Sequence, residues 1–227
     1  MARVLVIGDT HCPAMRNDYV DFLKDIHKAW ACDRVVHIGD LVDWQAISYH
    51  EKSPSCSNAF LEFEQAMVQV QQLYKAFPKA DWMIGNHDAL SERQAVSAGL
   101  PPQVLRSYTD MWQVPGWKAH ARFSKFKLDG VIYSHGDAGK GGMMAALKQA
   151  RDNFRSTVIG HFHAEAGVWF GANEEFRYFG MNAGTGVDSK NAAMNYGKKY
   201  PRKPVNGCGV VIDGTTAVFE PMKLASR

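Results

Sequence analysis

The chain has 227 residues, of which 46% are hydrophobic and 22% are charged. These fractions match an ordinary soluble globular protein and exclude disordered, collagen-like and coiled-coil classes, and the length predicts a single domain over residues 1–227. The 26 basic and 23 acidic side chains leave a net charge of +3, an excess too small to argue for a nucleic-acid or membrane partner.

Cysteine spacing and hydropathy both favour a cytoplasmic protein. Cys12, Cys32, Cys56 and Cys208 form neither a CxxC pair nor a dense disulfide framework, so we expect reduced thiols in the cytosol. The N-terminal residues run directly into a strand pattern, and no run of about 18 apolar residues occurs. We therefore expect neither secretion nor insertion into a membrane.

Strand and helix patterns alternate through the first half of the chain. Apolar, β-branched runs predict strands at residues 4–7, 34–38, 81–84, 131–133, 157–159, 176–179 and 209–212. Apolar residues at spacings of three and four predict helices at residues 19–30, 58–77, 91–98, 102–112 and 143–154. Asn17 or Asp18 is expected to cap the first helix, Asn58 to cap the second and Pro78 to end it.

This order of elements indicates the fold class. Strands alternate with helices early in the chain, and mainly strands occupy the last third. Such an order predicts an α/β domain of two packed mixed β-sheets, a β-sandwich, with helices outside.

Five polar clusters follow predicted strands, and each combines glycine or serine with side chains that can bind a metal. They are Gly8-Asp9-Thr10-His11, Gly39-Asp40-Leu41-Val42-Asp43, Gly85-Asn86-His87-Asp88, Ser134-His135-Gly136-Asp137 and Gly160-His161-Phe162-His163. Open α/β sheets bind ligands just beyond the carboxyl ends of their strands. We therefore expect the five loops to converge on one crevice.

The spacing within two of the clusters supports a shared site. Asp9 and His11 are two residues apart, as are His161 and His163. In extended backbone, side chains at this spacing point to the same side, and Cys12 then points away from His11 as a small buried residue.

Among the side chains of these clusters, the candidate ligands are two carboxylates, four imidazoles and one amide oxygen. This set is too large for one tetrahedral ion with an open position, and two metal ions fit it better. Mixed oxygen and nitrogen donors without a thiolate favour divalent transition metals, with Mn²⁺ first and Fe, Zn, Co or Ni as alternatives, over Ca²⁺. Two such ions beside Asp9 and Asp40 leave a centre of charge +2, which favours an anionic phosphate-ester substrate.

The ordered motifs GDTH, GDLVD, GNHD, SHG and GHFH, which span residues 8–163, resemble those of the calcineurin-like metallophosphoesterase superfamily. The resemblance implies a four-layer arrangement of helices around two sheets, and hydrolysis of phosphate esters by a hydroxide that bridges two metal ions. It also implies a ligand set: Asp9, His11 and His163 on the first metal, Asp40 on both, and Asn86, His135 and His161 on the second.

The resemblance further implies catalytic roles for His87 and Asp88. His87 occupies the position that protonates or stabilises the leaving oxygen, and Asp88 is expected to orient it. For Asp43 and Asp137 two interpretations stay open: they hold a ligand imidazole or a metal-bound water, or they are ordinary turn residues.

One position departs from the family's protein phosphatases. They carry arginine directly after the second aspartate of GDxxD, and here that residue is Trp44. The change weakens the phosphoprotein-phosphatase hypothesis and favours phosphodiester, nucleotide or small phosphomonoester substrates. A phosphomonoesterase, including a protein phosphatase, and a catalytically inactive scaffold are the alternatives, although retention of His87 argues against the scaffold.

Two further features leave alternatives open. The segment Lys190 to Lys203 holds five basic residues, no acidic ones and two tyrosines, so it is either a nucleic-acid contact or a solvated loop. The aromatic residues of 44–57 and 100–120 either wall the substrate cleft or serve core packing or a dimer contact; they are Trp44, Tyr49, Trp112 and Trp117. The sequence does not predict the oligomeric state.

Overall fold

The computed structural model describes residues 1–49, 57–139, 141–142, 144–191 and 201–224. The first sheet has the strand order β11-β10-β1-β2-β3-β4. Its strands are β1 (Arg3–Ile7), β2 (Arg34–His37), β3 (Ala80–Met83), β4 (Trp117–His120), β10 (Gly207–Ile212) and β11 (Thr216–Pro221). The second sheet has the order β5-β6-β7-β9-β8. Its strands are β5 (Phe126–Leu128), β6 (Val131–Tyr133), β7 (Thr157–Ile159), β8 (Gly167–Ala172) and β9 (Arg177–Asn182).

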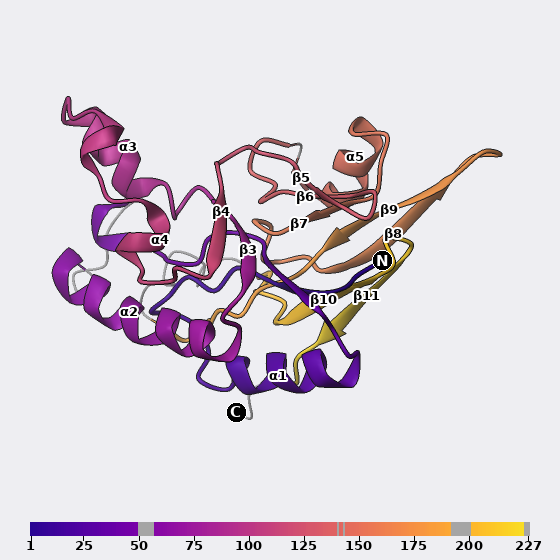
Figure 1. Cartoon of the computed structure of the whole chain (residues 1–227), viewed down its shortest axis with the longest axis horizontal. Helices are drawn as coiled ribbons and strands as arrows, with labels where there is room; N and C mark the ends of the chain where they lie inside the picture. The colour runs from indigo at the N-terminus through magenta and orange to yellow at the C-terminus, as the bar shows by residue number, and fades with distance from the viewer. Residues whose placement is uncertain (50–56, 140, 143, 192–200, 225–227) are drawn as a thin grey trace.

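Helices lie on the outer faces of the two sheets and at the β4 end of the sandwich (Figure 1). They are α1 (Tyr19–Ala29), α2 (Ala59–Ala76), α3 (Leu90–Ser97), α4 (Tyr108–Met111) and α5 (Ala145–Asp152), with short 3₁₀ turns η1 (Gln45–Ile47) and η3 (Pro102–Val104). Helices α1 and α2 pack on the first sheet, and α5 packs on β7, β8 and β9 of the second. The structure confirms the predicted α/β sandwich with helices on both sides.

The first strand shows why an uninterrupted apolar run occurs in this fold. Val4 and Val6 face the second sheet, where they pack against residues such as Val158. Leu5 and Ile7 face the opposite way, into the core beneath α1 and α2. Because the strand is buried on both faces, it has no polar side to alternate with.

Parallel pairing places the ends of the central strands at common edges. Strands β1, β2, β3 and β4 run parallel, and β6, β7 and β9 run parallel in the other sheet. The loops that follow β1, β2, β3, β6 and β7 therefore leave the sandwich where ligand sites form in α/β folds.

The two predicted helix caps have different outcomes. The Asn58 side chain accepts hydrogen bonds from the backbone N–H groups of Phe60 and Leu61, both at 3.1 Å, as predicted. Asp18 stands at the N-cap of α1, but its carboxylate makes no capping bond and instead pairs with Arg16 at 2.7 Å. A guanidinium offers a charge-assisted partner that outcompetes a backbone N–H.

The helix predicted over residues 102–112 is wrong. Turn η3 ends at Leu105, whose backbone is extended with ψ of 152°. The chain then starts a new short helix at Ser107, whose hydroxyl accepts a hydrogen bond from Asp110 N at 3.2 Å. The polar cap and the extended residue divide the segment because neither continues a helical hydrogen-bond ladder.

The helix predicted at 143–154 ends early, and four strands were not expected. Helix α5 stops at Asp152, and Phe154, expected on its apolar face, adopts φ of +49° and is 80% exposed. The unexpected strands are β4, β5, β8 and β11. They are short or contain charged, glycine or proline residues, so they lack the apolar run that marks a central strand.

Candidate metal centre

The five loops bring the side chains named from the sequence to one place. Ligand atoms of these side chains lie within 4.8 Å of one another in three overlapping groups. The first group is Asp9–His11–His163, the second is Asp40–His135–His161, and His11–Asp40–His87 connects the two. Asn86 joins the second group, because its Oδ1 lies 3.1 Å from His135 Nε2. The seven candidate ligands therefore form one cluster.

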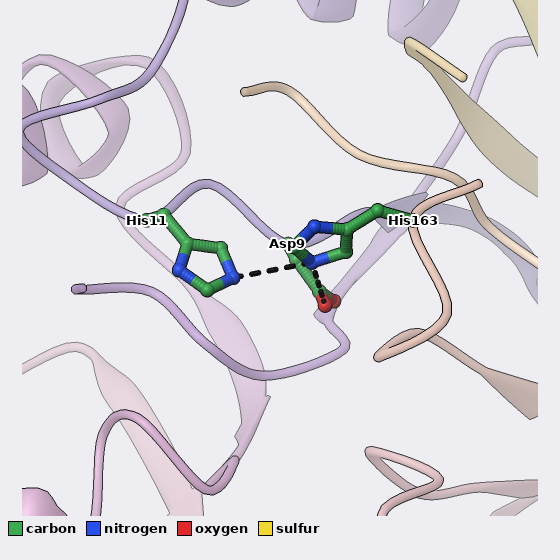
Figure 2. A group of neighbouring side chains, drawn as sticks. All are labelled: Asp9, His11 and His163. Atoms are coloured by element: carbon green, nitrogen blue, oxygen red, sulfur yellow. Dashed lines mark hydrogen bonds and ion pairs between the residues drawn. The ribbon is translucent and has the colours of Figure 1, made fainter. Parts of the chain in front are cut away.

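The first group surrounds the carboxylate of Asp9 (Figure 2). Asp9 Oδ2 lies 3.0 Å from His163 Nε2 and accepts a hydrogen bond from the backbone N–H of His161 at 2.8 Å. His163 Nε2 lies 3.2 Å from His11 Nε2. Within the described residues, Asp9 Oδ1 is buried without a hydrogen-bond partner.

The backbone of these loops differs from the extended conformation we expected. His11 has φ of +44° and His161 has φ of +66°, so both segments turn sharply. The N–H groups of Thr10 and His11 both donate to Asp40 O, at 3.1 and 2.9 Å, which holds the turn after β1 against the loop after β2. The turn, rather than strand alternation, brings His11 toward Asp9. Cys12 is buried, as expected.

The second group surrounds Asp40, whose two carboxylate oxygens have different neighbours. Asp40 Oδ1 accepts a hydrogen bond from His87 N at 2.8 Å. Asp40 Oδ2 lies 3.2 Å from His135 Nε2 and 3.6 Å from His11 Nε2. This oxygen therefore lies between imidazoles of the first and second groups.

Two glycines leave room for the carboxylates. A Cβ atom at Gly160 would overlap Asp9 Oδ1, and a Cβ atom at Gly85 would overlap Asp40 Oδ1. Any other residue at these positions would displace the carboxylates, because neither position has free space around it.

Comparison with protein families identifies the chain. The model of the family described as calcineurin-like phosphoesterase matches residues 2–183. The chain belongs to the calcineurin-like phosphoesterase family. The match confirms the resemblance drawn from the ordered motifs.

Solved structures and curated proteins add little to this assignment. A single mutant of Vps29 from Entamoeba histolytica is 12% identical, with 97% of this chain and 99% of that chain covered and a TM-score of 0.43. The nuclease MPE from Pseudomonas putida is 11% identical, with 95% and 86% covered and a TM-score of 0.30. No curated protein matches. Among the described residues, no helix is both long and apolar enough to cross a membrane.

Burial and neighbouring charges set the protonation of the phosphoesterase cluster. Burial and the nearby His87 lower the pKa of His11, and burial and the nearby His135 lower the pKa of His161. Burial also disfavours charge on His135, but the carboxylates of Asp40 and Asp9 outweigh it and raise the pKa of His135 to about 10. His135 Nδ1 donates to Ile38 O at 3.1 Å, so its Nε2 faces the cluster.

The cluster fits the divalent metals that calcineurin-like phosphoesterases use. Burial disfavours ionisation of Asp9 and Asp40, but the imidazoles around them keep the pKa of both carboxyl groups below the ordinary value. Buried carboxylates attract a cation, and among the described residues the buried Asp9 Oδ1 has no hydrogen-bond partner and can serve as a ligand atom. The donors are oxygen and nitrogen without sulfur, a set that suits transition metals.

His87 is held by Asp43 rather than by Asp88. His87 Nδ1 lies 2.7 Å from Asp43 O and 3.3 Å from Asp43 Oδ1. Because a carbonyl oxygen only accepts, Nδ1 carries a proton and Nε2 is the ring nitrogen left for a ligand. Asp43 Oδ1 also lies 2.7 Å from His11 Nδ1, so one aspartate orients two imidazoles of the cluster.

The expectation that Asp88 orients His87 is therefore wrong. The carboxylate of Asp88 accepts hydrogen bonds from Val42 N at 3.2 Å, Trp82 Nε1 at 3.2 Å and Gly85 N at 2.9 Å. Burial and the charge of Asp40 raise the pKa of Asp88 to about 7. Asp88 thus holds two backbone N–H groups of the loops and the indole of Trp82.

Asp137 pairs with Arg122, a residue that no motif identified. Arg122 Nε and Nη2 both lie 2.8 Å from Asp137 Oδ2. This pair links the loop after β4 to the loop after β6, and the charge of Asp137 also acts on His135 and His161, where it favours the protonated imidazole. A second missed residue is Glu62, which accepts hydrogen bonds from Gln45 N and Ala46 N at 2.7 and 2.8 Å. Both pairs join distant segments and leave no local sequence signal.

Of the four aromatic residues with open alternatives, Trp44, Trp112 and Trp117 pack in the core. Trp44 packs on Phe63 and Trp112, and Trp117 is 4% exposed. Tyr49 is exposed and lies under the guanidinium of Arg93. Of the basic segment at 190–203, residues 192–200 lie outside the described part of the chain.

Proposed function

We propose that this chain hydrolyses phosphate esters with two divalent metal ions, with Mn²⁺ first and Fe, Zn, Co or Ni as alternatives, and that its substrates are phosphodiesters or nucleotides. Asp9, His11 and His163 would hold one ion, Asn86, His135 and His161 the other, and Asp40 both. The observation that carries the proposal is the position of Asp40 Oδ2 between imidazoles of both groups. Two bound metal ions would act as Lewis acids toward the phosphoryl oxygens and would lower the pKa of the attacking water.

We propose that His87 donates a proton to the oxygen of the leaving group. Burial disfavours charge on this imidazole, but Asp40 and Asp43 outweigh it and raise the pKa of His87 to about 10 in the metal-free chain. The ring is therefore protonated at neutral pH, and its Nε2 is free because Nδ1 donates to Asp43 O. A protonated, oriented imidazole is suited to act as a general acid.

The preference for diesters rests on the charges around the cluster. A phosphomonoester dianion is bound best when a cationic side chain contacts its phosphate in addition to the metal ions. A phosphodiester carries one negative charge less and needs such a side chain less. Trp44 replaces the clamping arginine and is buried. No lysine or arginine of the described residues forms an ion pair with Asp9 or Asp40.

The compartment remains the cytosol in this proposal. The described cysteines Cys12, Cys32 and Cys208 are free and buried. Free thiols are typical of reducing compartments.

Hydrolysis of bis-p-nitrophenyl phosphate and of p-nitrophenyl phosphate by protein loaded with Mn²⁺ tests the proposal. We expect faster cleavage of the diester. Faster cleavage of the monoester would instead support a phosphomonoesterase, and cleavage of neither would support a scaffold without turnover.

The role of His87 is tested with His87→Ala and His87→Asn. We expect bound metal to stay at the wild-type level and kcat to fall by about 10²- to 10⁴-fold, the usual contribution of a general acid. Equal activity of His87→Ala and wild type would reject the assignment. Loss of metal from His87→Ala would place His87 among the ligands, as its grouping with His11 and Asp40 allows.

A further inference from the structure

A cavity of about 380 Å³ opens beside the candidate metal centre, next to His163 along the chain. Its lining comes from the loop after His163, from strand β8 and from the segment before β10. The residues that matter here are Ala164, Glu165, Trp169, Arg202, Lys203 and Val205. The volume lies at the lower end of the range for small-molecule sites and suits a group of the size of one nucleoside.

Hydrogen bonds tie the wall of this cavity to two candidate metal ligands. Val205 N donates to His163 O at 2.8 Å, and Thr185 N donates to Val205 O at 3.1 Å. Thr185 Oγ1 in turn donates to Asp9 O at 2.7 Å. These bonds place the cavity wall directly against the loops that carry Asp9 and His163, so the cavity is the neighbouring site for a substituent on a phosphate bound there.

Trp169 provides the cavity with an anchored aromatic surface. The indole is partly buried and packs, with Phe162, against the small cluster of Ala145, Ala146 and Ile159 under α5. The lining also includes the small apolar side chains of Ala164 and Val205. A flat ring is the group that such a surface binds best, since stacking on an indole needs area and little depth.

The polar groups of the lining match the edge of a nucleobase. Arg202 Nη1 lies 3.1 Å from Glu165 Oε1, and the pair brings further guanidinium N–H donors and a carboxylate acceptor to the lining.

We propose that this cavity binds the nucleobase of a phosphodiester substrate, with the base stacked on Trp169 and its polar edge at Arg202 and Glu165. The inference rests on the proposed function and narrows its substrate class from phosphodiesters in general to nucleotide esters.

Two diesters with the same leaving group test this. Thymidine 5′-(p-nitrophenyl phosphate) carries a nucleoside, and methyl p-nitrophenyl phosphate carries a methyl group in its place. We expect Trp169→Ala to lower the ratio of kcat/KM between the nucleoside and the methyl ester by about tenfold, the scale of one base–aromatic stacking contact. Trp169→Phe retains an aromatic face and should keep most of the ratio.

Phe170→Ala is the matched control. Phe170 follows Trp169 in β8 but is 52% exposed and stacks with Phe179 and Arg177, away from the cavity lining. We expect the wild-type ratio in this variant. Arg202→Gln, at an exposed ion pair, provides a second variant in case Trp169→Ala fails to fold, and it should lower the ratio about threefold.

Equilibrium binding separates failure of this inference from failure of the proposed function. Fluorescence anisotropy of mant-AMP measures binding without turnover, and Trp169→Ala should raise its Kd by about tenfold. Unchanged mant-AMP affinity and an unchanged substrate ratio in both variants would overturn the inference even if both diesters are hydrolysed. Cleavage of neither diester by wild type would overturn the proposed function, and the mant-AMP titration would still decide the inference.

Discussion

The group of Asp9, His11 and His163 and the group of Asp40, His135 and His161 use the same kinds of side chain, but their imidazoles differ in protonation. The pKa of His11 is lowered, whereas the pKa of His135 is raised to about 10. His11 is buried beside the cationic His87, while His135 faces two carboxylates without a competing cation. Equal ligand types therefore do not give equal metal sites, because the charges around each imidazole decide how strongly protons compete with the ion.

The largest effect is expected where the two groups meet. Asp40→Ala should lower the metal content, measured by inductively coupled plasma mass spectrometry, from about two ions to less than one per chain. Diester hydrolysis should fall on the order of 10³-fold, because both groups lose a shared carboxylate. Asp81→Ala is the control, since this buried carboxylate pairs with Arg34 and His120 outside the cluster. Two ions in Asp40→Ala would show that the groups do not share this ligand.

Removing one imidazole from each group in turn allows the metal binding of the two groups to be measured separately. His163→Ala should retain an ion at the second group and His135→Ala an ion at the first, so each variant should bind about one ion per chain. Calorimetric titration with Mn²⁺ measures the stoichiometry. Loss of both ions in either variant would mean that the two groups form one indivisible site.

A smaller effect is expected from the aspartate that orients His11. Asp43→Asn should weaken Mn²⁺ binding to the first group by about 10- to 100-fold, as is usual for partners that orient a metal ligand. His11 loses a charged acceptor at 2.7 Å, whereas no hydrogen bond of His135 involves Asp43. His163→Ala retains the ion of the second group, so the Mn²⁺ affinity measured in this variant should be the same with and without Asp43→Asn. A change in this affinity would show that Asp43 also supports the second group.

Proton competition should appear as a pH dependence that involves about one proton, the one carried by His135. The folded pKa of His135 is about 10 and the ordinary value is 6.5, so in metal-free protein its contribution to stability is complete below pH 6.5 and disappears as the pH rises through 10. Urea unfolding of metal-free protein from pH 6.5 to 10 measures this loss.

Metal binding runs in the opposite direction, because the proton must leave before His135 binds an ion. The Mn²⁺ affinity of His163→Ala, which keeps the second group, should rise by up to about tenfold per pH unit over the same interval. His135→Ala should show a shallower slope. An equal pH dependence of Mn²⁺ affinity in the two variants would show that protons compete with the ion equally in both groups.

The aromatic residues show how far sequence patterns reach. Trp44 and Trp169 are both tryptophans near the cluster, yet the first packs into the core and the second lines a cavity. Their local sequences do not distinguish these environments. The environment depends on which distant segments cover the indole, such as α2 over Trp44 and the segment before β10 beside Trp169.

The amino-acid sequence alone determined the family, the two-sheet architecture and the seven candidate ligands, because buried parallel strands are apolar runs and their ends carry the ligand side chains in a recognisable order. Only the tertiary structure decided that Asp43 orients His87 and that Asp88 instead accepts hydrogen bonds from backbone N–H groups. The same holds for the ion pair between Arg122 and Asp137. The physical reason is that hydrogen-bond partners and burial depend on contacts between residues far apart in the chain. Such contacts leave no periodicity in the sequence.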